Sequence, residues 1–221
     1  MHATQLGNAV SGLWEAAIDA TQWSDALARL GVAGGAAGAC IISQRPQVGV
    51  IVNKELAEPF DLYFKEGWHR LDLRKRGISR LMQGEVLTDA DVVTPGDIAA
   101  SPFYGDFLPR VGLSWWMGIG FKTADSFYGL TLQRGGRQDQ FTPEEKIKYS
   151  SIRPALSQLG RLLDVTEKSI IGTTLSALER LSHAAICLDR NGKVIGINPS
   201  AVRILHQPLT AANRKRPATI L

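Results

Sequence analysis

The chain has 221 residues, of which 44% are hydrophobic and 21% charged, and these proportions are typical of a globular protein rather than a disordered or fibrous one. Its two cysteines are too few for a disulfide scaffold or a cysteine-rich zinc site. No apolar stretch is long enough to span a bilayer, and the N-terminus lacks the basic and hydrophobic parts of a secretory signal. We therefore expect a cytoplasmic protein that does not associate with a membrane.

The formal net charge of +4 raises the question of nucleic-acid binding, so the distribution of the charge matters. Residues 61–80 hold six lysines and arginines against three acidic residues, and residues 183–221 hold six against one. Because the positive charge is confined to these two stretches, the sequence does not predict an evenly basic surface.

The N-terminal part of the chain predicts helices followed by a β-hairpin. Apolar residues recur with helical spacing over residues 5–30, which predicts a helical pair. The glycine-rich stretch 31–38 predicts a flexible turn, because it lacks the Gly-Lys-Ser/Thr ending of a nucleotide-binding loop. Two β-rich runs, 39–43 and 48–52, flank Arg45-Pro46-Gln47 and predict a hairpin.

The middle of the chain predicts a helix, a long loop and two strands. Helical spacing returns over residues 55–70. Glycines and prolines punctuate residues 71–112, which predicts an irregular loop of the kind that covers binding sites. Two strands are predicted at 113–121 and 127–133, joined by the turn 122–126.

A strong helix start follows at Thr142-Pro143-Glu144-Glu145, which supplies a threonine N-cap, a proline at the first helical position and a capping box. Helical spacing continues to residue 181, with Pro154, Gly160 and Gly172 as kink sites. Such a helix is longer than one small domain needs, so part of it is expected to pack against a second subunit. The dimerisation candidates are Leu159, Leu163, Ile170, Leu178 and Leu181.

The C-terminal part of the chain predicts a second hairpin. The runs 185–189 and 194–198 flank an Asn-Gly turn, and Pro199 opens a helix. This passage resembles the opening of a PAS domain, in which a strand ending in Asp, a glycine turn and a strand ending in Asn lead into a helix. The later strands of a PAS core do not follow, so residues 183–221 are interpreted as a truncated PAS-like segment. Its basic run Asn213–Arg216 is interpreted as a linker rather than a DNA contact.

Three passages in residues 1–165 carry a second resemblance: Ala20-Thr21-Gln22-Trp23, the segment from Ser101 to Leu108 with Gly112-Leu113, and Phe141 to Glu145. They resemble the N-terminal sensory region of bacterial LuxR-type helix-turn-helix transcriptional regulators. The resemblance implies a GAF-like α-β-α sandwich with a central antiparallel sheet over 1–165 and a coupling and dimerisation helix over 166–182. It also implies a homodimer that binds DNA only through a module missing from this chain.

Acyl-homoserine-lactone receptors of the wider LuxR class use a Trp/Tyr/Asp constellation near the third helix. Tyr63, Trp68 and Asp72 supply these residue types without the expected spacing. The resemblance therefore does not predict lactone binding for this chain. We expect it to bind an unidentified small-molecule effector or no ligand.

Aromatic residues provide the best candidates for a ligand pocket, because such pockets are mostly apolar with a few oriented polar groups. The alternative is that they fill the core. Since Trp115 and Trp116 are adjacent in a predicted strand, at most one of them points into a pocket. Trp14 and Trp23 are assigned to the core. The ligand-binding candidates are Tyr63, Trp68, Phe103, Phe107, Trp115, Trp116 and Phe127.

A basic cluster precedes an acidic stretch, and two interpretations of it stay open. The cations would either clamp an anionic ligand or form a solvated face that pairs with nearby carboxylates. The basic residues are Arg70, Arg74, Lys75, Arg76 and Arg80, and the acidic ones are Asp89, Asp91 and Asp97.

Nothing in the sequence predicts an enzyme. The four histidines are scattered, and no nucleophile motif or paired catalytic carboxylates stand out. Cys40 lies in an apolar strand and is predicted to be inert. We therefore expect no catalytic residues, metal or cofactor. The two hypotheses that remain are the sensing and dimerisation region of a LuxR-type regulator and a ligand-free dimerisation scaffold.

Overall fold

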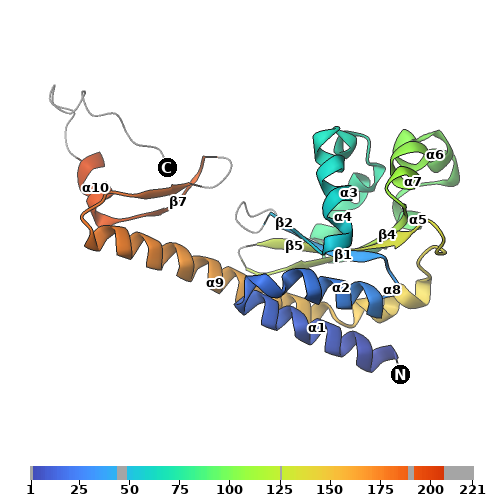
Figure 1. The fold of residues 1–221 in the computed structure, drawn as a ribbon, viewed down its shortest axis with the longest axis horizontal. Coiled ribbons are helices and arrows are strands. Elements are labelled where there is room, and N and C mark those ends of the chain that lie inside the picture. Colours follow the sequence, from blue (N-terminus) through green and yellow to red (C-terminus); the bar gives the residue numbers. More distant parts are fainter. Residues whose placement is uncertain (1, 44–48, 125, 189–191, 207–221) are drawn as a thin grey trace. The chain divides into compact units, whose positions relative to one another are not determined.

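The computed structural model describes residues 2–43, 49–124, 126–188 and 192–206 (Figure 1). The chain forms two compact units, residues 1–166 and 167–221, and each is described by itself. The predicted turn Arg45-Pro46-Gln47 and the basic run Asn213–Arg216 lie outside the described residues. In the described parts of the chain, no helix is both long and apolar enough to cross a membrane.

The first unit is built on a five-stranded sheet with the order β2-β1-β5-β4-β3, in which all neighbouring strands are antiparallel. The strands are β1 (Gly38–Ser43), β2 (Val50–Val52), β3 (Val86–Thr88), β4 (Leu113–Lys122) and β5 (Phe127–Gly135). The predicted β1–β2 hairpin and the predicted strands at 113–121 and 127–133 are confirmed, as is the α/β class with a central antiparallel sheet.

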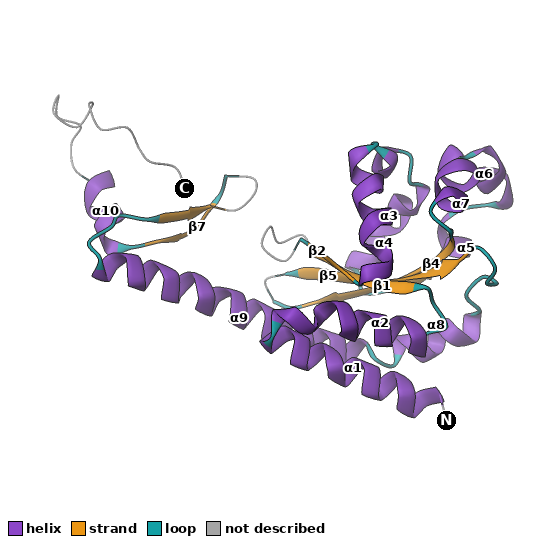
Figure 2. Ribbon diagram, viewed as in Figure 1, coloured by secondary structure: helices purple, strands orange, loops and turns teal. Residues whose placement is uncertain are grey.

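One face of the sheet is covered by the N-terminal helices and the helices after β5 (Figure 2). Alternate residues of β5, Tyr128, Leu130 and Leu132, are buried against this layer, as the period-2 geometry of a strand requires. Trp14 and Trp23 pack in the same core, as predicted. The helices are α1 (His2–Ile18), α2 (Trp23–Ala33), α8 (Pro143–Ser150) and α9 (Arg153–Arg180). Because α2 extends to Ala33, the first residues of the predicted glycine turn are helical.

The opposite face carries α3 (Lys54–Lys65) and a series of short helices. The prediction of an irregular loop over 71–112 is wrong. Capping boxes at Thr88/Asp91 and Thr94/Asp97 start two of these helices, so the prolines and glycines mark helix ends rather than a continuous loop. The segments are η2 (Trp68–Arg70), η3 (Leu73–Gly77), α4 (Ile78–Met82), α5 (Asp89–Val92), α6 (Pro95–Ala100), the π-helical turn η4 (Phe103–Phe107) and α7 (Leu108–Arg110).

The predicted helix over 55–70 is also shorter than expected. Helix α3 ends at Lys65, and Gly67 then adopts a left-handed conformation with φ of +81°. A glycine is favoured there because L side chains rarely adopt this backbone geometry. The chain resumes as the separate short helix η2.

The long C-terminal helical region is divided in two. The capping box at Thr142 is confirmed, since Thr142 Oγ1 accepts from the Glu145 amide at 3.2 Å and the Glu145 carboxylate accepts from the Thr142 amide at 2.9 Å. Helix α8 ends at Ser150, and Pro154 lies in the first turn of α9, where its missing N–H is tolerated. Gly160 and Gly172 lie within α9 without ending it.

Two of the dimerisation candidates lie in the interior of the first unit. Leu159 and Leu163 are 0% and 7% exposed and belong to the core beneath the sheet. Their apolar surface is already covered by their own chain. The prediction that they form a dimer interface is therefore corrected: both are core residues. Leu178 is half-buried, while Ile170 and Leu181 are 62% and 67% exposed; a dimerisation role for these three stays a prediction.

The second unit contains the predicted hairpin, β6 (Ile186–Leu188) and β7 (Val194–Ile197), followed by α10 (Pro199–Leu205). Asn198 is the N-cap of α10 and accepts from the Ala201 amide at 3.0 Å. Glu179 of α9 accepts from the Ser200 amide and hydroxyl, each at 2.9 Å, which attaches α10 to the end of α9. The turn residues 189–191 lie outside the described residues.

A matched pair of glycine substitutions tests the packing of the second sheet face. Gly120 and Gly129 are cross-strand partners, but a Cβ at Gly120 would overlap the Leu81 carbonyl, whereas a Cβ at Gly129 meets nothing within 4 Å. We expect Gly120→Ala to lower the free energy of unfolding by more than about 2 kcal/mol. Gly129→Ala should change it by less than about 1 kcal/mol, in the stabilising direction. Urea unfolding followed by tryptophan fluorescence measures both, and equal effects would contradict the packing.

Candidate ligand-binding site

A cavity of about 380 Å³ lies between the second face of the sheet and the layer formed by α3 and the short helices. Its lining is mostly apolar, with a few polar side chains. From the sheet it is lined by Ile42, Val50, Leu113, Trp116, Phe127, Gly129, Thr131 and Gln133. From the helical layer it is lined by Pro59, Phe60, Tyr63, Phe64, His69, Asp72, Arg74, Lys75, Ile78, Leu81, Phe103, Phe107 and Leu108.

The cavity exists because the middle of β5 presents small side chains, at Gly129 and Thr131, to a layer of large ones. Strand β5 places Gly129, Thr131 and Gln133 on the cavity side, while its larger alternate residues fill the opposite core. Open space lies where a side chain of Gly129 would stand. The aromatic residues of α3 and η4 reach across from the other side without filling this space.

Five of the seven aromatic candidates line the cavity: Tyr63, Phe103, Phe107, Trp116 and Phe127. The rings of Phe103 and Phe107 are stacked, with centroids 5.5 Å apart, and Tyr63 meets Phe103 edge-on at 6.1 Å. The structure thus brings these five together, and their contact with a ligand stays a prediction.

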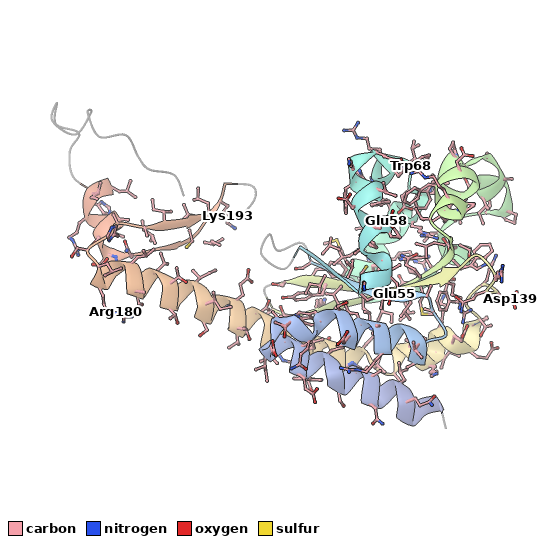
Figure 3. The ribbon with its side chains drawn as sticks, in the orientation of Figure 1. Glu55, Glu58, Trp68, Asp139, Arg180 and Lys193 are labelled. Atoms are coloured by element: carbon pink, nitrogen blue, oxygen red, sulfur yellow. The ribbon has the colours of Figure 1, made fainter. Side chains whose placement is uncertain are left out.

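The other two candidates lie elsewhere. Trp115 packs against the core on the opposite face of the sheet, so only one of the adjacent tryptophans reaches the cavity, as strand alternation predicted. Trp68 lies between α3 and the α6–α7 region, on the side away from the sheet (Figure 3). It stacks on Phe107 at 5.2 Å and donates from Nε1 to Glu66 at 2.8 Å, so it supports the cavity wall from behind.

Arg74, which lines the cavity, forms a buried ion pair with Asp89. Arg74 and Asp89 are 6% and 2% exposed, and Arg74 Nε donates to Asp89 Oδ1 at 2.7 Å. Asp89 also accepts from the Tyr104 hydroxyl and from the Trp116 amide, the latter at 2.6 Å, and Arg74 Nη2 donates to the Ser114 carbonyl at 3.0 Å. The pair therefore joins η3, α5, η4 and β4 at one point.

Neighbouring carboxylates maintain the positive charge of Arg74. Burial alone would lower the pKa of Arg74, but the carboxylates of Asp89 and Asp72 outweigh burial and raise the pKa above its usual value. The guanidinium also lies 5.3 Å from the ring centroids of Phe103 and Tyr104, within range of a cation–π interaction. Arg74 is thus a permanent cation with its charge compensated by the protein.

Tyr63 and Asp72 meet at the cavity despite their unexpected spacing in the sequence. The Tyr63 hydroxyl donates to Asp72 Oδ2 at 2.9 Å, and Asp72 Oδ1 accepts from the Arg74 amide at 2.9 Å at the start of η3. Burial and then the Asp72 carboxylate raise the pKa of Tyr63, so its phenol stays neutral and donates. Trp68 does not join them.

The basic cluster is largely paired with acidic residues. Besides Arg74 with Asp89, Arg76 Nη1 lies 3.0 Å from Asp97 and Arg80 Nη2 lies 2.7 Å from Glu85. The intramolecular partners Asp89 and Asp97 are therefore confirmed. The third predicted partner, Asp91, accepts from Lys146 Nζ of α8 at 2.7 and 2.8 Å and, through its carbonyl, from Arg80 at 3.1 Å. Lys75 lines the cavity from an exposed position.

Cys40 is fully buried, with Sγ 2.9 Å from the Thr131 hydroxyl. Burial raises the pKa of its thiol to about 12, which keeps it protonated at neutral pH and supports the prediction of an inert side chain. Within the described ranges, no three His, Cys, Asp or Glu side chains are grouped as metal ligands would be.

Sequence reasoning missed three polar residues that line the cavity, His69, Thr131 and Gln133, and it missed the burial of Asp89. Asp89 was considered only as a partner for surface cations, although it follows the N-cap Thr88 and is almost fully buried. Gln133 was not considered at all. The alternation Gly129, Thr131, Gln133, which places polar and small residues on one face of β5, was the signal that would have identified it.

The site and its fold are those of an α-β-α sandwich with an apolar cavity on one side of its sheet. No protein-family model matches this chain, and no curated protein matches its sequence. Solved structures that are similar include the ligand-binding domain of VqsR from Pseudomonas aeruginosa, with 16% identity, a TM-score of 0.48, and coverage of 71% of this chain and 94% of that one. Another is the N-acylhomoserine-lactone-dependent LuxR-family transcription factor CepR2 from Burkholderia cenocepacia, with 21% identity, a TM-score of 0.48, and coverage of 73% and 93%.

The buried ion pair generates a stability prediction. Asp89→Ala leaves the Arg74 guanidinium buried without its counter-charge and removes the acceptor of the Tyr104 hydroxyl and the Trp116 amide. We expect the free energy of unfolding to fall by about 3–5 kcal/mol in urea denaturation.

The matched control is Arg76→Ala, which breaks the ion pair with Asp97 at a side chain that is 52% exposed. It should cost no more than about 1 kcal/mol. If Asp89→Ala were as mild as this control, the ion pair would not be the constraint described here.

Proposed function

We propose that the first unit is a sensory domain that binds a small, mostly apolar effector, and that the chain is the sensing and dimerisation region of a LuxR-type transcriptional regulator. The observation that carries ligand binding is the 380 Å³ cavity, with aromatic walls and a few polar groups, which has the size and composition of small-molecule sites. The assignment to a regulator rests on the sequence motifs. DNA binding belongs to a helix-turn-helix module that these residues do not include, and the GAF-like and PAS-like relationships are part of the same proposal.

The geometry supports a route by which an effector would act. A ligand in the cavity touches Arg74, whose partner Asp89 begins α5. Two residues further on, Asp91 is bound by Lys146 of α8 on the other face of the sheet. Suppose that η3 and α5 can take two positions and that the ligand binds one of them more tightly. The ligand would then also shift the position of α8, by an amount set by the difference between its affinities for the two positions.

Saturable stabilisation by a small molecule tests the proposal. We expect a thermal-shift screen of metabolites, followed by native mass spectrometry, to identify a compound that binds one per chain. At a hundredfold excess over its Kd it would stabilise the fold by about 2.7 kcal/mol. Gly129→Leu should abolish the shift, because its side chain projects into the open part of the cavity.

Gly136→Leu is the matched control, since it introduces the same side chain at a position with nothing within 4 Å and outside the cavity lining. It should leave the shift intact. A screen without any saturable compound would favour the alternative function, a ligand-free dimerisation scaffold.

Dimerisation gives a separate prediction. Ile170 and Leu181 expose 62% and 67% of their surface on α9 or just after it, and burial of such residues is a common driving force for association. We expect light scattering to give twice the 24.0 kDa of the chain, and Ile170→Asp combined with Leu181→Asp to shift the mass towards one chain. Ile147→Asp, at a residue of α8 that is 74% exposed, should not change the mass. A wild-type chain that is strictly monomeric would contradict the dimer.

A further inference from the structure

The cavity contains one buried side chain whose hydrogen-bonding capacity is only half used. Gln133 is 7% exposed and lines the cavity from β5. Its Oε1 accepts from Arg74 Nη1 at 3.4 Å, and this contact fixes the oxygen on the side of the cation. Among the described residues, no acceptor pairs with Nε2, the donor end of the same amide. The cavity therefore has a built-in donor with no protein partner.

In the empty cavity this donor is open to hydration, but a ligand that displaces the water leaves it without a hydrogen bond unless the ligand supplies an acceptor. The polar group that completes it has to be an acceptor, since an amide nitrogen only donates. The hydroxyl of Thr131, the nearest polar side chain along β5 on this face, lies 2.9 Å from Cys40 Sγ. The acceptor is thus to be supplied from within the cavity.

The charges around the cavity are already balanced. Arg74 is paired with Asp89 at 2.7 Å, and the Asp72 carboxylate and the Lys75 ammonium add one charge of each sign to the lining. An anionic ligand would meet the Asp72 carboxylate and a guanidinium already paired with Asp89, and a cationic one would meet Arg74 itself. Because a buried charge is stable only when it is paired, the site favours a ligand without net charge.

The remaining wall beside Gln133 and Arg74 is aromatic. Phe103, Phe107 and Trp116 line the cavity there, and aromatic rings favour stacked or edge-to-face contacts with a flat ring. Phe127 adds a further ring from the other end of β5. An aryl group would therefore match the walls better than a polar body.

We infer that the effector is an uncharged aryl compound with a carbonyl-type oxygen, and that this oxygen accepts a hydrogen bond from Gln133 Nε2 beside Arg74. The inference rests on the proposed ligand-binding function of the first unit. It assigns Gln133 as the residue that determines specificity for an oxygen acceptor.

Three probes of similar shape test it by equilibrium dialysis: benzophenone, diphenylmethane, which lacks the oxygen, and diphenylacetate, which carries a negative charge. The measured quantity is the ratio of the Kd of diphenylmethane to that of benzophenone. We expect Gln133→Met to lower this ratio about fivefold, the effect of one hydrogen bond. Diphenylacetate should bind the wild-type chain more weakly than benzophenone.

Gln133→Glu is the second variant, because it keeps an oxygen for Arg74 and replaces only the donor. It should lower the ratio at least as much as Gln133→Met, even if the latter folds poorly. Gln140→Met, at an exposed residue outside the cavity lining, should leave the ratio unchanged.

Three other results would contradict the inference or the proposed function. Saturable binding with a ratio that neither Gln133 variant changes would overturn the inference and leave the binding function standing. Tightest binding of diphenylacetate would overturn the requirement for an uncharged ligand. If none of the three probes bound saturably while the metabolite screen found another ligand, the inference would be overturned and the proposed function would stand; if neither experiment gave a ligand, both would be contradicted.

Discussion

The ion pair between Arg74 and Asp89 is the interaction on which the cavity side of the first unit depends. It is buried, and it joins segments that are 15 to 40 residues apart in the chain, including the backbone of β4 at Ser114 and Trp116. Removing two charges from water is costly, so such a pair is stable only where further hydrogen bonds complete it. Here the Tyr104 hydroxyl and two backbone groups do so. The short helices between α3 and β4 are thus held by one polar centre as well as by apolar packing.

The two faces of the same sheet are packed differently. On one face, large side chains such as Tyr128 fill the space beneath the helices, and Gly160 lets α9 approach the Tyr128 ring. The Tyr128 hydroxyl donates to Asp164 of α9 at 2.7 Å and fixes that contact. On the other face, small residues leave room, and the aromatic helical layer spans it. The two sides of the sheet therefore differ in packing: large side chains fill one side, and the other holds the cavity beside the Arg74–Asp89 ion pair.

The sequence predicted those parts of the fold that local patterns determine. The capping box at Thr142, the alternation across Trp115 and Trp116 and the two hairpins are properties of neighbouring residues, and they were found. The helices within residues 71–112 were not predicted: the capping boxes at Thr88 and Thr94 are local signals that were overlooked, whereas the packing of this segment depends on contacts such as that of Asp89 with the Trp116 amide, 27 residues away. Five cavity aromatics were predicted from their residue type; the alternation in β5 places Gln133 on the same face, but its contact with Arg74 could not be read from the sequence.

The different environments of the two cysteines have a consequence for the covalent chemistry of the chain. Cys40 is sealed beneath the sheet surface with its thiol protonated, while Cys187 in β6 is only half-buried. Oxidants dissolved in water therefore reach Cys187 first, and Cys40 does not supply the thiolate that a disulfide within the chain would require. A disulfide formed by the folded chain would therefore join Cys187 to a cysteine of a second copy. Oxidation would cross-link two molecules rather than close a loop within one.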